Sequence, residues 1–200
     1  MKGTIEDSIE YCSKSDTKAG DYVTNHVSKK RKIDMSMDDD YCIKFDDLFP
    51  WGQSLVTMVD DMLPGKLDRR IFWIWSQSGQ MKKTETARYL CHHHHGCVIQ
   101  GGRKHILATA YQCSAPIYIL TIPRTDEGFV SYASIELLKD NLYMSGFGVK
   151  ATGMVNRKKP WVIINIMANF PPDTSSLSED RWVVHNVDLV DGMSPMISFS

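Results

Sequence analysis

A near-continuous apolar run toward the end of the chain constrains the fold more than any other feature. The run spans residues 161–167 and contains Trp, Val, Ile and Met side chains with one Asn among them. Strands of parallel sheets are buried on both faces, so they show such runs in place of an alternating pattern. Pro171 and Pro172 then end the strand, and Asn169 stands between the strand and the prolines. The sequence predicts a buried parallel strand with a polar residue at its carboxyl end.

The remainder of the chain from about residue 45 alternates between helical and strand patterns. We expect helices near 53–62, from Lys83 onward and across 130–140, and strands at 71–75, 98–99, 117–120 and 161–167. Such alternation is typical of an α/β domain with a parallel sheet. Ligands of these domains lie at the carboxyl ends of the strands, where Lys83, Thr121 and Asn169 fall.

Five stretches together resemble one known family, the replication-associated proteins (Rep) of small circular single-stranded DNA viruses and their satellites, above all of the nanovirus and alphasatellite type. The stretches are PWGQSL (50–55), RIFWIWSQSGQMKKTETARYL (70–90), AYQ (110–112), IYILTIPRTDE (117–127) and LSEDRW (177–182). The resemblance implies the helicase part of Rep, a superfamily 3, AAA+-like P-loop ATPase with an α/β parallel-sheet core. It also implies ATP and Mg²⁺ as cofactors.

The resemblance assigns a phosphate-binding loop to the segment before the second helix. In such loops backbone N–H groups face the phosphates, a Lys meets their oxygens and a Ser or Thr hydroxyl binds Mg²⁺. Lys82 stands where the family has a second glycine, at a position whose backbone often adopts dihedrals that only Gly adopts cheaply. The cofactor-binding residues implied by the match are Gly79, Gln80, Met81, Lys82, Lys83, Thr84 and, on a later strand, Thr121.

Two further positions depart from the family pattern. Thr121 occupies the place of the Asp that holds Mg²⁺, and a hydroxyl compensates far less charge than a carboxylate. The stretch 101–105, GGRKH, keeps the glycines but has no Asp. We therefore expect weak nucleotide binding and still weaker hydrolysis. Asp126 and Glu127 lie beyond the following proline, either within reach of a metal or as solvated loop carboxylates.

The resemblance also implies catalytic roles for Asn169 and for one cationic residue. In the family an Asn at the position of Asn169 polarises the attacking water or the γ-phosphate. Ring ATPases further need a cation from a neighbouring subunit, and Arg181 and Arg124 are both candidates. Either Arg is alternatively a partner in a structural ion pair with Glu179 or Asp180.

DNA contacts are expected on a β-hairpin within residues 145–159, which resembles the pore hairpin of these ring helicases. Lys150, Arg157, Lys158 and Lys159 are its candidate phosphate contacts, and a solvent-facing basic loop is the alternative. The partners implied are single-stranded or origin DNA and a homo-oligomeric ring or intact Rep.

The start of the chain resembles the end of the family's nicking domain. There Tyr11 would be the nucleophile that attacks a DNA phosphate, and Lys14 would position that phosphate. The strands carrying the family's metal-binding His residues would precede Met1, so we expect no nicking activity. The expected units are this remnant (1–22), a linker (23–44), the ATPase domain (45–185) and a tail (186–200). The linker contains a basic tetrad, 29–32, that resembles a nuclear localisation signal.

Composition narrows the remaining possibilities. A net charge of −1 with a pI near 6.6 argues against DNA binding over the whole surface. No run of about 18 apolar residues and no signal pattern is present, so we expect neither membrane insertion nor secretion. Five scattered Cys fit a reducing compartment, and the cluster 91–97, CHHHHGC, is expected to hold no metal. Two functions remain open, a working replicative helicase part and a catalytically decayed Rep-like fragment.

Overall fold

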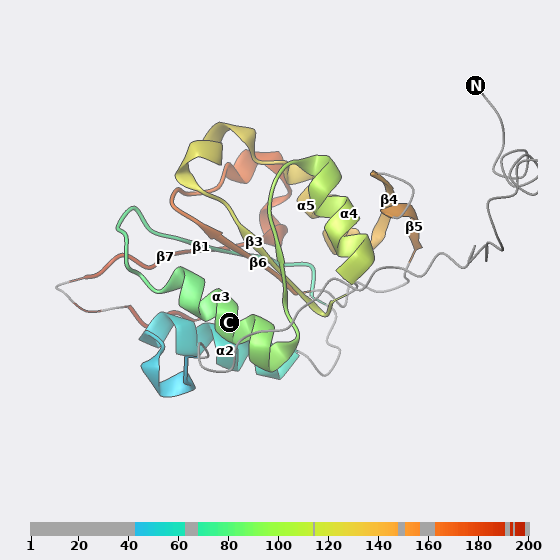
Figure 1. Cartoon of the computed structure of the whole chain (residues 1–200). Helices are drawn as coiled ribbons and strands as arrows, with labels where there is room; N and C mark the ends of the chain where they lie inside the picture. Colours follow the sequence, from blue (N-terminus) through green and yellow to red (C-terminus); the bar gives the residue numbers. More distant parts are fainter. Residues whose placement is uncertain are drawn as a thin grey trace, which may run out of the picture.

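The chain folds around a five-stranded sheet in the computed structural model (Figure 1), which describes residues 43–62, 68–113, 115–147, 151–156, 163–190, 193 and 195–198. All neighbouring strands of this sheet run parallel. Their order is β2-β3-β6-β1-β7, with β1 at Ile71–Trp75, β2 at Cys97–Ile99, β3 at Ile117–Thr121, β6 at Ile163–Ala168 and β7 at Trp182–Asn186. The predicted α/β class with a parallel sheet is confirmed, and this core is compatible with a P-loop NTPase fold.

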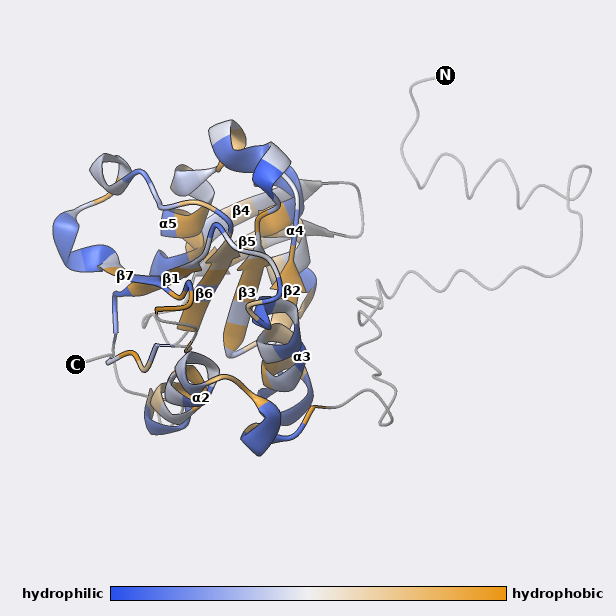
Figure 2. Cartoon of the chain, turned by 90° about the vertical axis from the view of Figure 1, so that its left-hand side faces the viewer, coloured by the Kyte–Doolittle hydropathy of each residue, from blue (hydrophilic) through white to orange (hydrophobic). Residues whose placement is uncertain are grey.

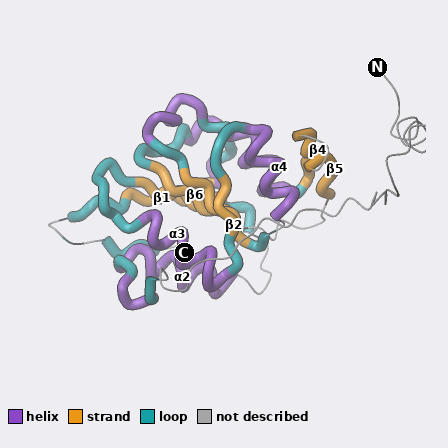
Figure 3. Tube along the Cα trace, viewed as in Figure 1, coloured by secondary structure: helices purple, strands orange, loops and turns teal. Residues whose placement is uncertain are grey.

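Helices cover both faces of the sheet (Figures 1 and 3). Helices α2 (Pro50–Met62) and α3 (Lys83–His94) lie on one face, while α4 (Arg103–Cys113) and α5 (Tyr132–Asp140) lie on the other. An apolar core fills each interface, and in Figure 2 the strands between the helices are largely orange. Shorter 3-10 helices occur at Phe45–Asp47, Arg124–Phe129, Thr174–Ser176 and Glu179–Arg181.

The predicted buried strand is the centre of the sheet. Every residue of β6 is buried, and the strand pairs with β1 on one side and β3 on the other. This position explains the apolar run, because a central parallel strand meets helices on both faces. The first two residues of the predicted strand, 161 and 162, lie outside the described residues.

The hairpin predicted within residues 145–159 begins earlier than expected, at Leu142. Strand β4 (Leu142–Phe147) pairs antiparallel with β5 (Ala151–Asn156) as a separate two-stranded sheet. The hairpin packs on α4, where a Cβ atom at Gly153 would collide with the Tyr111 ring. Glycine at this position therefore permits the close approach of the hairpin to α4.

Two elements were not predicted, α4 and β7. Helix α4 begins with three basic residues and mixes polar and apolar side chains, so its sequence gives a weak helical signal. Strand β7 is an edge strand whose residues are partly or fully exposed, so it lacks the apolar run of β6. Tertiary contacts support both elements, because α4 packs on the β4–β5 hairpin and on β2, and β7 pairs with β1.

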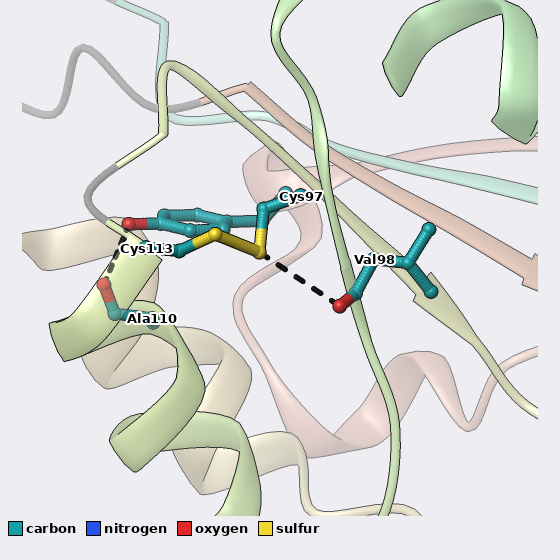
Figure 4. Close-up of a disulfide and its surroundings, with 5 residues drawn as sticks. Cys97, Val98, Ala110 and Cys113 are labelled. Carbon is teal, nitrogen blue, oxygen red and sulfur yellow. Dashed lines mark hydrogen bonds between the residues drawn. A yellow bond between two sulfur atoms is a disulfide. The ribbon is translucent and has the colours of Figure 1, made fainter. Parts of the chain in front are cut away.

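A disulfide joins Cys97, at the start of β2, to Cys113, at the end of α4 (Figure 4). This pairing differs from the expectation of reduced cysteines, because the fold brings together two thiols that are 16 residues apart in sequence. Near the same end of α4, the Tyr118 hydroxyl donates to the Ala110 carbonyl oxygen over 3.1 Å.

No helix in the described part of the chain combines the length and the apolar character needed to cross a membrane.

Candidate functional site

A cleft of about 990 Å³ opens at the carboxyl ends of β1, β3 and β6. It is lined by residues 78–85, which span the connection from β1 and the first turn of α3, and by side chains at or just beyond the ends of the other strands. The cleft brings together all the sequence-predicted cofactor residues, Gly79, Gln80, Met81, Lys82, Lys83, Thr84 and Thr121, together with Asn169. Residues that are up to 90 positions apart along the chain meet here because parallel strands end at one edge.

The Lys83 ammonium group lies at the centre of a small hydrogen-bond network. It donates to the Ser76 hydroxyl and, over 3.1 Å, to Asn169 Oδ1. Ser76 is fully buried and its own hydroxyl donates to the Ser78 carbonyl oxygen over 2.9 Å. Burial lowers the pKa of Lys83, although the nearby Asp188 carboxylate partly opposes this shift. A partly desolvated cation is thus held beside the predicted sensor Asn169, where an anionic ligand would meet it.

Lys82 adopts the left-handed backbone conformation, with φ 55° and ψ 22°. Glycine adopts this conformation without a steric penalty, which agrees with the expectation that the backbone at this position, a glycine in the family, has dihedrals that favour glycine. Its ammonium group donates to the Asp47 carbonyl oxygen over 2.6 Å and lies 4.9 Å from the Phe49 ring centroid. The Lys82 ammonium group therefore contacts residues 47–49, just before α2, in place of pointing only into the cleft.

Thr121, the last residue of β3, is hydrogen-bonded by the residue that follows the neighbouring strand β2. Its hydroxyl oxygen accepts a hydrogen bond of 2.7 Å from Gln100 Nε2. Thr84, Glu85 and Asp126 line the same cleft, so beside Thr121 it presents a second threonine hydroxyl and two carboxylates, of which that of Glu85 is paired with Arg88. Magnesium prefers hard oxygen ligands of this kind. The donor set fits a Mg²⁺ ion that accompanies bound phosphates.

Two residues that contact the loop were not assigned to it from the sequence. Asp188, just after β7, accepts hydrogen bonds from the amides of Gln77 (3.1 Å) and Ser78 (2.9 Å). Burial acts to raise the pKa of Asp188, but these amide hydrogen bonds lower it overall. Arg124 donates to the Gln77 carbonyl oxygen over 2.7 Å. No local signal marks Asp188, because only the parallel pairing of β7 with β1 carries it to the loop.

Arg181 lies at the amino end of β7, whereas the cleft lies at the carboxyl ends of the strands. Its side chain is buried and donates to Asp140 Oδ1 over 2.9 Å, with Glu136 Oε1 at 3.8 Å. The ion pair considered from the sequence involved its neighbours Glu179 or Asp180, but the fold supplies carboxylates of α5. The structure thus places Arg181 and Arg124 in different surroundings, and Arg124 is the one beside the loop.

Several predicted site residues lie outside the described part of the chain. They are the nicking residues Tyr11 and Lys14, the basic tetrad at 29–32, and the hairpin cations Lys150, Arg157, Lys158 and Lys159. Among the described residues, no group of three or more His, Cys, Asp or Glu side chains is arranged to hold a metal ion. In the predicted His cluster, His94 Nδ1 lies 3.5 Å from Asp60 Oδ1.

No protein-family model matches the chain. It is similar to the master replication protein of Faba bean necrotic yellows virus (isolate Syrian SV292-88), with 30% identity over 125 residues that cover 62% of this chain and 42% of that protein. It is also similar to the Para-Rep C1 of Milk vetch dwarf C1 alphasatellite, with 26% identity over 212 aligned residues that cover 90% of this chain and 73% of that protein. It is similar to the master replication protein of Banana bunchy top virus as well, with 28% identity over 123 residues that cover 62% of this chain and 41% of that protein. The chain spans less than half the length of the master replication proteins it matches.

Proposed function

We propose that this chain, a homologue of the replication proteins (Rep) of nanoviruses and alphasatellites, is the ATP-binding helicase part of a rolling-circle replication protein. The observation that carries the proposal is the position of Lys83. Its ammonium group stands at the start of α3, in the cleft and 3.1 Å from Asn169 Oδ1. A cation at a helix N-terminus beside a polar strand end favours a polyphosphate ligand.

The residues of the cleft have separate tasks in this proposal. The backbone amides of residues 79–84 and the Lys83 ammonium would bind the phosphates of ATP, and the Thr84 hydroxyl would be a ligand of Mg²⁺. Asn169 orients the water that attacks the γ-phosphate. Bound Mg²⁺ neutralises charge on the phosphates. Asp188 and Arg124 fix the backbone around Gln77 and so keep the loop in place.

Weak hydrolysis is part of the same proposal. The end of β3 offers the Thr121 hydroxyl, which already accepts from Gln100, where a carboxylate would compensate the charge of a metal ion. Lys82 holds a left-handed conformation at a cost of about 1 kcal/mol relative to glycine. Both features support binding with slow turnover.

DNA is the proposed partner of the motor, through the hairpin of β4 and β5 and the basic residues that adjoin these strands in sequence, Lys150, Arg157, Lys158 and Lys159. A subunit ring or an intact Rep is the proposed assembly, and the nucleus of a host cell is the proposed location. The same two features of the cleft, Lys82 and Thr121, favour one second candidate, a decayed Rep-like fragment that associates with intact Rep and does not hydrolyse ATP.

ATP hydrolysis by the purified chain with Mg²⁺ tests the proposal, with and without single-stranded DNA. We expect turnover above that of Lys83→Ala and stimulation by DNA. Turnover equal to that of Lys83→Ala, together with retained nucleotide binding, would favour the decayed fragment. Failure to bind nucleotide at all would refute both the motor and its ATP site.

A further inference from the structure

The cleft contains two carboxylate side chains among its described lining residues, Glu85 and Asp126. Glu85 is already paired, because its Oε1 lies 2.9 Å from Arg88 Nη1 on the next turn of α3. Asp126 makes no ion pair in the described part of the chain. Of the two negative side chains, Asp126 is therefore the one whose charge is not compensated by a neighbouring cation.

The backbone after β3 turns Asp126 back toward the cleft. Its amide donates to the Pro123 carbonyl oxygen over 3.0 Å, which begins the 3-10 helix Arg124–Phe129. The Asp126 side chain is half-buried at the cleft wall, and one of its oxygens accepts a 3.2 Å hydrogen bond from the Thr125 hydroxyl. The adjacent Glu127 is exposed and does not line the cleft. Of these two neighbouring carboxylates, one faces the proposed phosphate site and the other faces solvent.

The end of β3 offers no carboxylate ligand for Mg²⁺, and Asp126 is a nearby carboxylate that lines the cleft. A Mg²⁺ ion bound with phosphates usually takes one or two carboxylate ligands from the protein and keeps several waters. The cleft offers the hydroxyl of Thr84, in the first turn of α3, and that of Thr121, the last residue of β3, and Thr121 already accepts from Gln100. Two neutral hydroxyls provide no charge to oppose that of the ion.

We propose that Asp126 supplies the carboxylate that holds the Mg²⁺ of the bound nucleotide, directly or through a water ligand, five residues beyond the strand end that lacks one. The inference rests on the proposed nucleotide site. It assigns the metal-dependent part of binding to Asp126, while Lys83 and the loop amides carry the metal-independent part. The 3-10 helix after Pro123 thus supplies the carboxylate ligand for Mg²⁺ that the end of β3 lacks.

Fluorescent ATP analogue binding, titrated with Mg²⁺ and with excess chelator, tests this assignment in the full chain. Asp126→Asn keeps the size of the side chain and removes its charge, and Glu127→Gln makes the same change on the exposed neighbour. We expect Mg²⁺ to tighten nucleotide binding by the unsubstituted chain and by Glu127→Gln about tenfold. In Asp126→Asn, Mg²⁺ should tighten nucleotide binding much less. In excess chelator, this variant should bind the nucleotide as well as the unsubstituted chain does.

A second variant guards against an indirect effect of the substitution on the loop. Thr121→Asp in the Asp126→Asn background returns a carboxylate to the end of β3 and should restore the Mg²⁺ gain. Binding of Mn²⁺ with the nucleotide, followed by electron paramagnetic resonance, should weaken in Asp126→Asn and recover in the double variant.

The outcomes separate the two proposals. If the unsubstituted chain shows the Mg²⁺ gain and Asp126→Asn keeps it, the assignment of Asp126 is overturned while the nucleotide site stands. If the unsubstituted chain binds no nucleotide in either condition, the proposed function fails and the metal assignment fails with it. Equal losses in Asp126→Asn and Glu127→Gln would show a general charge effect and would also overturn the assignment.

Discussion

The ammonium group of Lys83 lies 3.1 Å from Asn169 Oδ1, which joins the start of α3 to the end of β6 across 86 residues of sequence. The contact connects the residue proposed to bind phosphate with the residue proposed to orient water. Because Asn169 is neutral, it positions the lysine without neutralising it, so the positive charge stays available to an anion. The pKa of Lys83 is lowered by burial, and a bound phosphate would compensate the desolvated cation.

Asn169→Asp should weaken nucleotide binding. A carboxylate at this position would form a charge-assisted hydrogen bond with Lys83 and compete with phosphate, which we expect to lower affinity about tenfold. Titration with a fluorescent ATP analogue measures the effect. Asn169→Ala is the control, since it removes the contact without adding charge and should change affinity less. An Asp variant that binds as well as the Ala variant would contradict the role given to this contact.

Lys82→Gly should be more stable than Lys82→Ala. Both variants lose the contacts of the ammonium group with Asp47 and the Phe49 ring, but only Gly adopts the observed φ of 55° without a Cβ penalty. We expect a difference of about 1 kcal/mol in the free energy of unfolding, measured by urea denaturation. At ordinary helical positions Ala is the more stable of the two. Greater stability of the Ala variant would mean that residue 82 is not left-handed in solution.

Reduction of the disulfide should destabilise the fold. The Cys97–Cys113 bond closes a loop over 16 residues of sequence separation, and such loops stabilise by about 3 kcal/mol through restriction of the unfolded chain. Cys113→Ser should therefore lower the melting temperature measured under oxidising conditions, and added reductant should not lower it further. Cys91→Ser is the matched control, because Cys91 is a free thiol whose pKa burial raises to about 11. A Cys113→Ser protein as stable as the oxidised parent would show that the bond contributes nothing.

Arg181→Ala should lower stability more than it lowers nucleotide binding. Arg181 is buried and pairs with Asp140, whose side chain is 46% exposed. We expect a loss of about 2 kcal/mol in the free energy of unfolding, below the range for fully buried pairs because the carboxylate is partly solvated. Arg69→Ala is the control, because it breaks the exposed Arg69–Asp180 pair of 3.6 Å and should leave stability almost unchanged. Unchanged stability with lost turnover would instead support Arg181 as the cation that ring ATPases require.

Stability should rise with pH above about 8 because of Lys139. Burial lowers the pKa of Lys139 from 10.5 to about 8, with the Asp68 carboxylate opposing the shift and Arg181 and Arg70 adding to it. Between these two values the unfolded chain binds the proton that the folded chain has released, so stability increases with pH. The gain is about 1.4 kcal/mol for each pH unit of this window. Urea denaturation between pH 7 and pH 10 measures it, and Lys139→Met should abolish this part of the pH dependence. Parallel pH profiles of the parent and the variant would rule out the depressed pKa.

The sequence by itself determined the class of the fold and the main residues of the cleft. Strands β1, β3 and β6 are buried on both faces and therefore consist of apolar runs. Such a run can be identified from the local sequence, without knowledge of the strands that pair with it. The phosphate-binding loop at 79–84 is predicted because residues 70–90 resemble that of the Rep family, with Gly79, Lys83 and Thr84 at the matching positions. Asn169 was identified because it directly follows an apolar strand.

Only the tertiary structure decided which distant residues complete the site. Strand β7 lies at the edge of the sheet and its residues are partly exposed, so its sequence shows no apolar run that would predict a strand. Only the pairing of β7 with β1 brings Asp188 to the amides of Gln77 and Ser78. The Cys97–Cys113 pairing and the separation of Asp126 from Glu127 likewise depend on how chain segments cross in space. Burial and strand pattern are local properties that a sequence displays, whereas proximity at the edge of a sheet arises only when the strands have paired.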